Sequence, residues 1–532
     1  MKNIFILFIL TIITGTIMAQ EDNIKFDDVK VIKEFNATLG DFNKINIDPV
    51  LPVFDLKSRQ YVYSIRSVPV KLNYEKPQIR PLALKSIDGI QPKKYFIKLG
   101  YGIPKYLKAQ LSIGYKKNNM NSNLLINHIS ADNSGSLPDQ KISKTGLDFS
   151  FFNRKNESDI EYGSNINIEG DYFYLYAIES DDTLQPYANN KRRFLRGNLN
   201  GFFTKENLFN KLKNTTDFNY KFLQLNTSGQ IENTIIFSNK SKISVNENMH
   251  FIFPVLADLI FSKQKYYLVG TKPKFIFNSK LVNIKIGGDI IKSQDDFYAY
   301  PSAELSLNIF HNFLEIFGSI TNDIYNNSNY LTTIENPFLN FDKEYINTSV
   351  FNNFSGGIRN SLEGAKIEFF ATYQKIHNKQ FFINSTDKKT FDVIYDNGKD
   401  IKLEANISYK FIPQLEISGS LTKHFYKMDK LNKAWYNPDF TANFTTKSNL
   451  FSDKLLIKGE LFFASQSWYQ GLDGNSYKLD PLFDISAVAK YKLFNNSSVF
   501  VELNNIFAQK YQRWYRYPSL GLNFMAGMEI RF

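Results

Sequence analysis

The end of the chain constrains the fold more than any other segment. The last eleven residues, LNFMAGMEIRF, alternate between apolar side chains and residues that are mostly polar or small. The apolar positions are Leu522, Phe524, Ala526, Met528, Ile530 and Phe532. Side chains of a strand alternate between its two faces, so this segment has one apolar and one wetter face, as a strand between lipid and an aqueous lumen requires. It predicts the closing strand of a membrane barrel; an amphipathic strand that merely ends there is the alternative.

The same alternation recurs over long segments elsewhere. From residue 401 to residue 411 the outward set is Ile401, Leu403, Ala405, Ile407, Tyr409 and Phe411, and the residues between them are all polar or charged. Residues 107–115, 282–290 and 415–421 repeat the pattern. A tilted strand crosses a membrane in about 9 to 11 residues, whereas the strands of soluble sandwiches have about 5 to 6 and need a second sheet. We therefore expect an all-β membrane protein, a large antiparallel transmembrane β-barrel.

The start of the chain predicts export and a division into three parts. An uncharged run at residues 4–18 follows Lys2, and Ala19 and Gln20 form a cleavage site, so residues 1–19 are expected to be a signal peptide. Residues 20–93 contain six prolines, which cannot donate to a sheet ladder. We expect an extended periplasmic segment there, with a disordered leader as the alternative. Residues 94–532 are expected to form the outer-membrane barrel, with about 22 strands in a range of about 16 to 24.

Aromatic and turn residues suggest where strands end. The chain has 49 Phe, 31 Tyr and 3 Trp, which cluster near expected strand ends. In YQRWYRYP at 511–518 we expect Tyr511, Trp514, Tyr515 and Tyr517 to form part of an interface girdle, because amphipathic rings favour the headgroup level. The Asp396-Asn397-Gly398 stretch predicts a tight hairpin. FIFPVLADLIF, at 251–261, is interpreted as a buried or interfacial loop because a proline and an aspartate interrupt it.

From Ala489 onward the sequence resembles the last three barrel strands of TonB-dependent receptors. The segment VFVELNNIF at 499–507 resembles their penultimate strand, the aromatic loop follows, and a glycine-containing last strand ends in Phe. The resemblance implies a plugged barrel of about 22 strands. It also implies that the last strand carries the membrane-insertion signal, at Phe532, Ile530, Met528 and Phe524, which the barrel-insertion machinery reads. Residues 20–93 are too few for the family's plug and lack its glycine-rich loops, which puts energised gating through TonB in doubt.

Two classes of function remain open. The first is solute uptake or a pore, with the lumen filled by the N-terminal segment, by loops or by a partner. The second is a structural or assembly subunit of a larger outer-membrane complex without transport. The expected partners are outer-membrane lipid, the insertion machinery and a possible periplasmic or outer-membrane protein bound through residues 20–93. The solute is unknown.

Other functions find little support in the sequence. The five histidines are scattered without metal-ligand spacing, and no nucleotide loop or hydrolase motif occurs, so we expect no enzyme activity, no cofactor and no metal. There is no Cys, which excludes disulfides. The net charge of +12 is spread singly along the strands, so no nucleic-acid partner is expected. The densest basic run, Lys191 to Arg193 with Arg196, is interpreted as a solvated turn; a rim or loop contact to acidic groups is the alternative.

Overall fold

The computed structural model describes residues 94–155, 159–176, 191–208, 211–226, 228–309, 313–362 and 364–532. The signal peptide, its cleavage site at Ala19 and Gln20, and the segment 20–93 lie outside the described residues and stay predictions. Within the described part, no helix is both long enough and apolar enough to cross a membrane.

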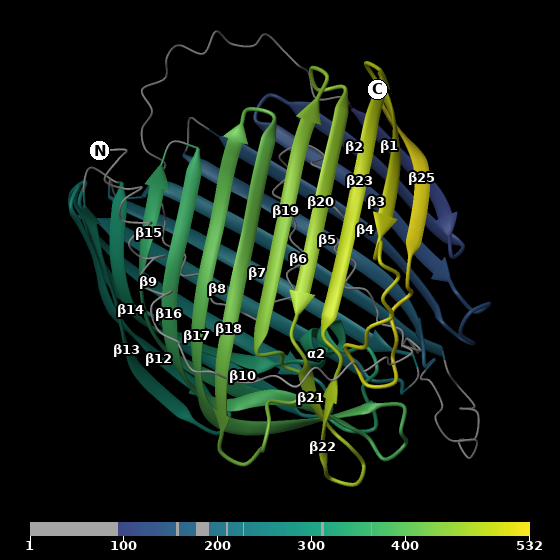
Figure 1. Cartoon of the computed structure of the whole chain (residues 1–532). Helices are drawn as coiled ribbons and strands as arrows, with labels where there is room; N and C mark the ends of the chain where they lie inside the picture. The colour runs from purple at the N-terminus through teal and green to yellow at the C-terminus, as the bar shows by residue number, and fades with distance from the viewer. Residues whose placement is uncertain are drawn as a thin grey trace, which may run out of the picture. The chain divides into compact units, whose positions relative to one another are not determined.

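The described chain forms a closed antiparallel β-barrel of 22 strands, which confirms the predicted class and strand number (Figure 1). Each strand pairs with the next, and β25 pairs with β1 to close the wall. β10 and β11 both pair with β9 and β12, so they share one interrupted wall position. The strands of the wall are β1 Tyr95–Ile103, β2 Tyr106–Lys117, β3 Met120–Asp132, β4 Lys141–Lys155, β5 Ile160–Tyr174, β6 Lys191–Leu208, β7 Leu212–Leu225, β8 Ile231–Ser244, β9 Met249–Phe261, β10 Lys265–Thr271, β11 Lys274–Asn278, β12 Val282–Ser293, β13 Phe297–Ile309, β14 Leu314–Asn327, β15 Asn347–Leu362, β16 Ala365–Asn384, β17 Phe391–Ile412, β18 Leu415–Met428, β19 Phe440–Leu450, β20 Leu455–Ala464, β23 Leu482–Phe494, β24 Ser497–Asn504 and β25 Asn523–Arg531.

Two short elements lie outside the wall. The helix α2 spans Asn329–Glu335, between β14 and β15. The strands β21 Ser467–Gln470 and β22 Ser476–Leu479 form a separate hairpin between β20 and β23.

Alternation places apolar side chains outside and polar ones inside, as expected. Leu403 and Ile407 on β17 are 46% and 43% exposed, whereas Lys402, next to Leu403, is 8% exposed. An exposed apolar outer face around a closed wall is the pattern that lipid contact requires. Phe524 and Met528 on β25 and Phe532 directly after it are likewise exposed.

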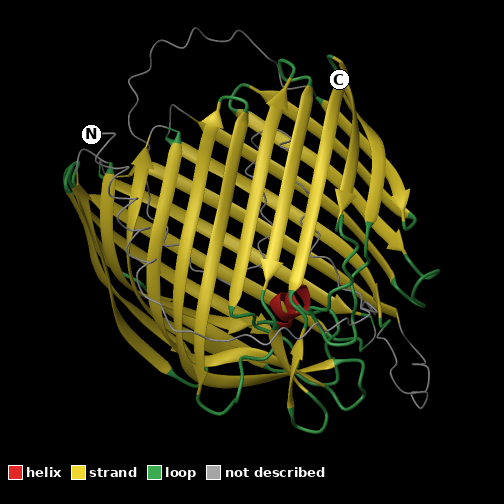
Figure 2. Cartoon of the chain, in the orientation of Figure 1, coloured by secondary structure: helices red, strands yellow, loops and turns green. Residues whose placement is uncertain are grey.

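The two ends of the barrel differ in the length of their connections. At one end, which we call the turn end, the strands are joined by short turns such as 118–119, 413–414 and 495–496. The other end, the loop end, carries the long connections 328–346, 429–439, 465–481 and 505–522, and these gather there with α2 (Figure 2). Outer-membrane barrels have short periplasmic turns and longer extracellular loops. The wall both begins and ends at the turn end, where Tyr95 and Phe532 pair through their backbones.

Two local predictions were wrong. Residues 251–261 are not a loop but most of strand β9, in which Phe251, Phe253 and Val255 face outward and are exposed. Asp396-Asn397-Gly398 is not a hairpin turn, because β17 runs through it for 22 residues. The Asp396 carboxylate instead accepts hydrogen bonds from the backbone of loop 429–439, and the ladder between β16 and β17 shifts register nearby. These polar residues therefore serve a tertiary contact rather than a turn.

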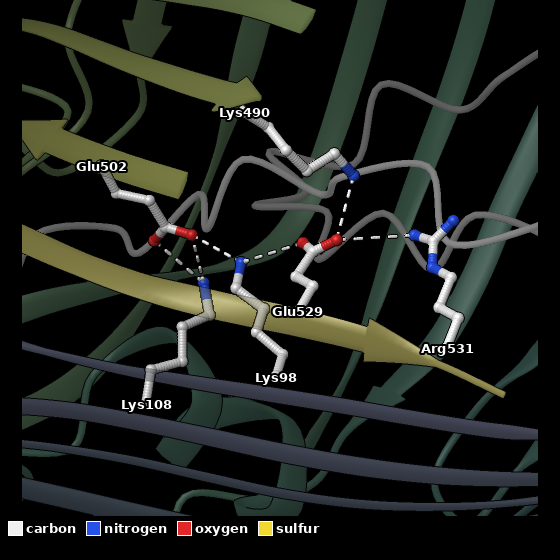
Figure 3. A network of polar contacts seen from close by, with 6 residues as sticks. All are labelled: Lys98, Lys108, Lys490, Glu502, Glu529 and Arg531. Carbon is white, nitrogen blue, oxygen red and sulfur yellow. Dashed lines mark hydrogen bonds and ion pairs between the residues drawn. The ribbon is translucent and has the colours of Figure 1, made fainter. Parts of the chain in front are cut away.

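A buried ionic network joins the first and last strands on the inner face of the wall (Figure 3). The Glu502 carboxylate lies 2.6 Å from the Lys98 ammonium and 3.2 Å from that of Lys108. Glu529 lies 3.1 Å from Lys490, and its contacts with Lys98 and Arg531 are longer. Each buried carboxylate has more than one cation beside it, which offsets the cost of removing the charge from water.

Candidate functional site

A large hydrophobic cluster lies at the loop end. It joins residues of the wall to residues of four long loops, so these loops pack against the wall instead of extending away from it. We call it the loop-end cluster; its wall members include Phe173, Phe194, Leu223, Leu225, Phe381, Phe382 and Phe391, and its loop members include Tyr330, Phe338, Leu339, Phe341, Tyr345, Trp435, Tyr436, Tyr469, Leu479, Trp514 and Tyr517.

The wall positions the helix of loop 328–346. Ser328 caps α2 by accepting a hydrogen bond from the backbone of Leu331. The carboxylate of Glu232, on β8, accepts two more from the backbone N–H groups of Asn329 and Tyr330, at 2.8 and 3.0 Å. The first N–H groups of a helix have no partner within it, and a negative charge is favourable at that end. A buried wall carboxylate therefore fixes the start of α2.

Two inward-facing arginines of β6 hold the rest of this loop. Arg196 forms an ion pair with Asp171 and donates to the carbonyl oxygen of Thr333 at 3.2 Å. Arg192 donates to the carbonyl oxygen of Leu339, also at 3.2 Å. Both guanidinium groups are buried, so the interpretation of this basic run as a solvated turn was wrong, and the alternative of a loop contact describes these two residues.

The aromatic loop 505–522 contributes to the same cluster. The ring of Tyr517 stacks on Phe338 with 3.6 Å between centroids, and its hydroxyl donates to the carbonyl of Lys389 at 2.6 Å. Tyr511 donates to the carboxylate of Asp484 at 2.6 Å.

The loop therefore does not form the expected interface girdle. Tyr511, Trp514 and Tyr517 are 5%, 3% and 1% exposed, and Tyr515 stacks on Tyr469 at 4.2 Å. These rings stack on other aromatic rings and form hydrogen bonds within the protein. They therefore do not lie at the headgroup level of the membrane, where a girdle would place them. The outward placement of Phe524, Met528, Ile530 and Phe532 agrees with the sequence pattern, whereas their role in insertion stays a prediction.

A group of polar side chains lies at the end of α2 and on the wall strands β16, β17 and β18. We call it the lumenal polar group; it consists of Glu335, the last residue of α2, and of Lys379, Gln380, Asp400, His424 and Tyr426 on the wall. The Nδ1 atom of His424 lies 2.6 Å from the carboxylate of Asp400, and the Tyr426 ring stacks on the imidazole at 4.9 Å. The Lys379 ammonium lies 4.9 Å from the centre of the Tyr426 ring.

The helix joins this group through Gln380. Its amide donates to the carboxylate of Glu335 at 3.1 Å and accepts from the hydroxyl of Thr332 at 3.2 Å. Nε2 of His424 and the hydroxyl of Tyr426 are buried and have no hydrogen-bond partner among the described residues. Buried polar atoms of this kind are ordinarily paired, so both atoms are available to a polar solute or to water. The described residues contain no group of three or more potential metal ligands.

Glu335, at the end of α2, is expected to make the stability of the folded protein depend on pH. The Glu335 side chain is exposed, but the protein that surrounds its carboxyl partly desolvates it and raises its pKa above the usual 4.5; Arg513, Lys379 and Gln380 act in the opposite direction without cancelling the rise. Between pH 4.5 and the raised pKa the folded protein therefore holds a proton that the unfolded chain has released, and stability falls as the pH rises through that range.

Glu335→Gln is expected to remove that loss. The variant should be more stable than the native protein at about pH 8 and should lose this advantage at about pH 4. Urea unfolding in detergent at both pH values measures the effect. Glu416→Gln, at an exposed position near the turn end, is the control and should leave the profile unchanged. A parallel pH profile for the Glu335 variant and the native protein would contradict the assignment.

The architecture was compared with known proteins. No protein-family model and no curated protein matches the sequence. Among solved structures, the FrpB iron transporter from Neisseria meningitidis matches 84% of this chain and 82% of its own, with a TM-score of 0.66 at 12% identity. The fold is that of the TonB-dependent receptor barrel.

Other receptors of this type give similar matches. The pyoverdine outer membrane receptor FpvA from Pseudomonas aeruginosa has a TM-score of 0.61 at 12% identity over 83% of this chain and 79% of its own. The siderophore receptor PirA from Acinetobacter baumannii has a TM-score of 0.60 at 9% identity over 84% of this chain and 81% of its own. The TonB-dependent receptor-like barrel thus extends over nearly all of the described chain, well beyond the C-terminal segment in which the sequence resemblance was recognised.

Proposed function

We propose that this TonB-dependent receptor-like barrel takes up a solute across the outer membrane and that its inward-folded loops close the loop end at rest. The loop-end cluster carries the proposal, because it ties loops 328–346, 429–439 and 505–522 to the wall with buried aromatic contacts. A barrel of this width cannot be filled by its own wall side chains, so a closure is needed. The structural neighbours, described as an iron transporter and as siderophore or pyoverdine receptors, favour uptake over a purely structural role.

The N-terminal segment completes the proposed arrangement. The wall begins at the turn end, which is the periplasmic end in outer-membrane barrels. In this proposal residues 20–93 are periplasmic and either fill the lumen or bind a periplasmic partner. In this proposal the lumenal polar group lies on the path of the solute, with His424 and Tyr426 offering hydrogen bonds. The signal peptide and insertion signal act before this stage.

All three tryptophans provide a local reporter for the test. Trp435 and Trp514 belong to the loop-end cluster and Trp468 packs against it. Their fluorescence therefore reports on the loop end alone. Ferric catecholate and ferric hydroxamate complexes, added to the purified full-length protein, are expected to change this emission saturably, whereas the iron-free siderophores should not. Proteoliposomes that contain the protein should take up the ferric complexes that change the emission and should not take up the iron-free siderophores.

Variants of the lumenal polar group separate uptake from binding at the surface. His424→Gln should lower uptake while leaving the fluorescence titration close to native, because His424 is not part of the loop-end cluster that holds the tryptophans. Absence of binding and of uptake for the whole panel, together with stable co-purification of other envelope proteins, would instead support the structural or assembly role.

A further inference from the structure

Three lysines lie in one row across the outer face of neighbouring strands. Lys375 on β16 is directly opposite Lys399 on β17, and Lys399 is directly opposite Lys427 on β18. All three side chains are exposed. Neighbouring strands are about 4.8 Å apart, so three positive charges stand side by side on one face. Like charges directly opposite each other destabilise a sheet, which makes the row unfavourable unless an anion neutralises it.

The row lies at the boundary of the apolar surface. Two residues nearer the turn end, the same strands carry a parallel row of Tyr373, Ile401 and Phe425, which are 39%, 47% and 51% exposed. The outward apolar positions of β17 continue from there through Leu403 and Ile407. The lysine row is therefore the first charged row beyond the lipid-facing band, on the side of the long loops.

No acidic side chain in the described part of the chain forms an ion pair with the row. Lys375, Lys399 and Lys427 make no ion pair among the described residues, whereas Lys423, on the same face of β18, lies 3.9 Å from the carboxylate of Asp439. Asp400, next to Lys399 in sequence, is buried on the other face and bonds His424. Asp429, the next acidic residue beyond Lys427, also forms no ion pair in the described part of the chain.

We infer that Lys375, Lys399 and Lys427 form a binding site for the phosphate groups of an outer-leaflet lipid headgroup. A phosphate carries the charge and the acceptor oxygens that ammonium groups require, and the apolar row directly beside the lysines contacts the acyl chains of the same lipid. A lipid with two phosphates spans the row better than one with a single phosphate. The inference depends on the outer-membrane placement proposed above. It does not depend on solute uptake, so the lipid site and the uptake proposal can fail independently of each other.

The test compares lipid binding by matched variants of the full-length protein. Lys375→Gln, Lys399→Gln and Lys427→Gln are combined in one variant, and Lys116→Gln, Lys117→Gln and Lys454→Gln, at exposed positions of the turn end, are combined in a control of equal charge. Native mass spectrometry counts bisphosphorylated lipid A retained by each protein. Loss of three basic groups is expected to weaken binding by about a hundredfold, and the control should bind like the native protein.

Two further measurements identify the ligand and exclude a merely structural role. Dephosphorylated lipid A should be retained no better by the native protein than by the row variant. Without lipid, in zwitterionic detergent, the row variant should melt at the native temperature or above it, because its like charges are gone. Equal retention of lipid A by the row variant, equal retention of the dephosphorylated lipid, complete replacement of the lipid by inorganic pyrophosphate, or a lower melting temperature of the lipid-free variant would each overturn the inference.

Discussion

Replacement of residues 329–345 by a short glycine–serine linker is expected to turn a closed barrel into an ion-conducting pore. The exchange removes α2 and the loop members Phe338, Leu339 and Phe341, on which the wall residues of the loop-end cluster pack. With this loop gone, the loop end has lost the closure that we propose, and single-channel conductance in planar bilayers should rise by on the order of tenfold or more, as for an unplugged wide barrel. The strands themselves should remain, because β14 and β15 pair along their length without the loop.

A four-way comparison separates this loop from the N-terminal segment. The native protein, the loop exchange, a deletion of residues 20–93 that keeps the signal peptide, and the combination are measured side by side. Deletion of the exposed hairpin tip at 471–475 serves as the control for loop shortening and should leave the barrel closed. If the loop exchange alone conducts no better than the native protein, and only the combined deletion opens the barrel, the closure belongs to residues 20–93 and the proposal for the loop is wrong.

Arg196→Ala is expected to be the most destabilising single substitution in the loop-end region. The side chains of Arg196 and Asp171 are each 3% exposed, so removal of the guanidinium leaves a buried carboxylate without its cation. The loss of one partner from a buried pair costs about 3–5 kcal/mol. It also frees the carbonyl of Thr333, which Arg196 binds in loop 328–346. Urea unfolding in detergent should report the loss of stability, and protease cleavage within the loop should become faster.

Two companion variants test the cause. Arg193→Ala removes a cation from the same strand, but Arg193 faces outward, over the ring of Tyr172, and this change should cost no more than about 1 kcal/mol. Arg196→Met combined with Asp171→Leu removes both charges and should recover most of the stability. If Arg193→Ala and Arg196→Ala lose the same stability, or if the double variant is no better than Arg196→Ala, the ion pair is not what holds this loop.

The wall of the barrel could be predicted from the sequence because its signal is local. The outward placement of Leu403 and Ile407 and the inward placement of Lys402 follow from a period of two that any short window reveals. The strand number followed from counting such windows. The strands exceed the predicted ten or so residues, as β17 does with 22, because they continue beyond the lipid-facing band into the loop end.

The candidate site could not be predicted because it depends on which strands are neighbours. His424 and Asp400 are 24 residues apart, and only the register of β17 with β18 brings them together. Glu232 caps a helix nearly a hundred residues away, and no local pattern marks it. The aromatic loop was misassigned for a related reason: Trp514 and Tyr517 have the composition of a girdle, and only their tertiary partners decide that they turn inward.

The ionic network of the seam makes completion of the barrel conditional on the whole chain. Lys98 and Glu502 are 404 positions apart, so their bond forms only after the last strands have reached the first. Contacts this distant form late in folding because the loop entropy must be overcome first. A chain that stops before β24 would leave Lys98 and Lys108 facing each other without a counter-charge, at the place where an open edge also exposes unpaired backbone. A truncated product therefore has both uncompensated positive charges and an unpaired strand edge at the same place. Only the full set of strands closes the wall.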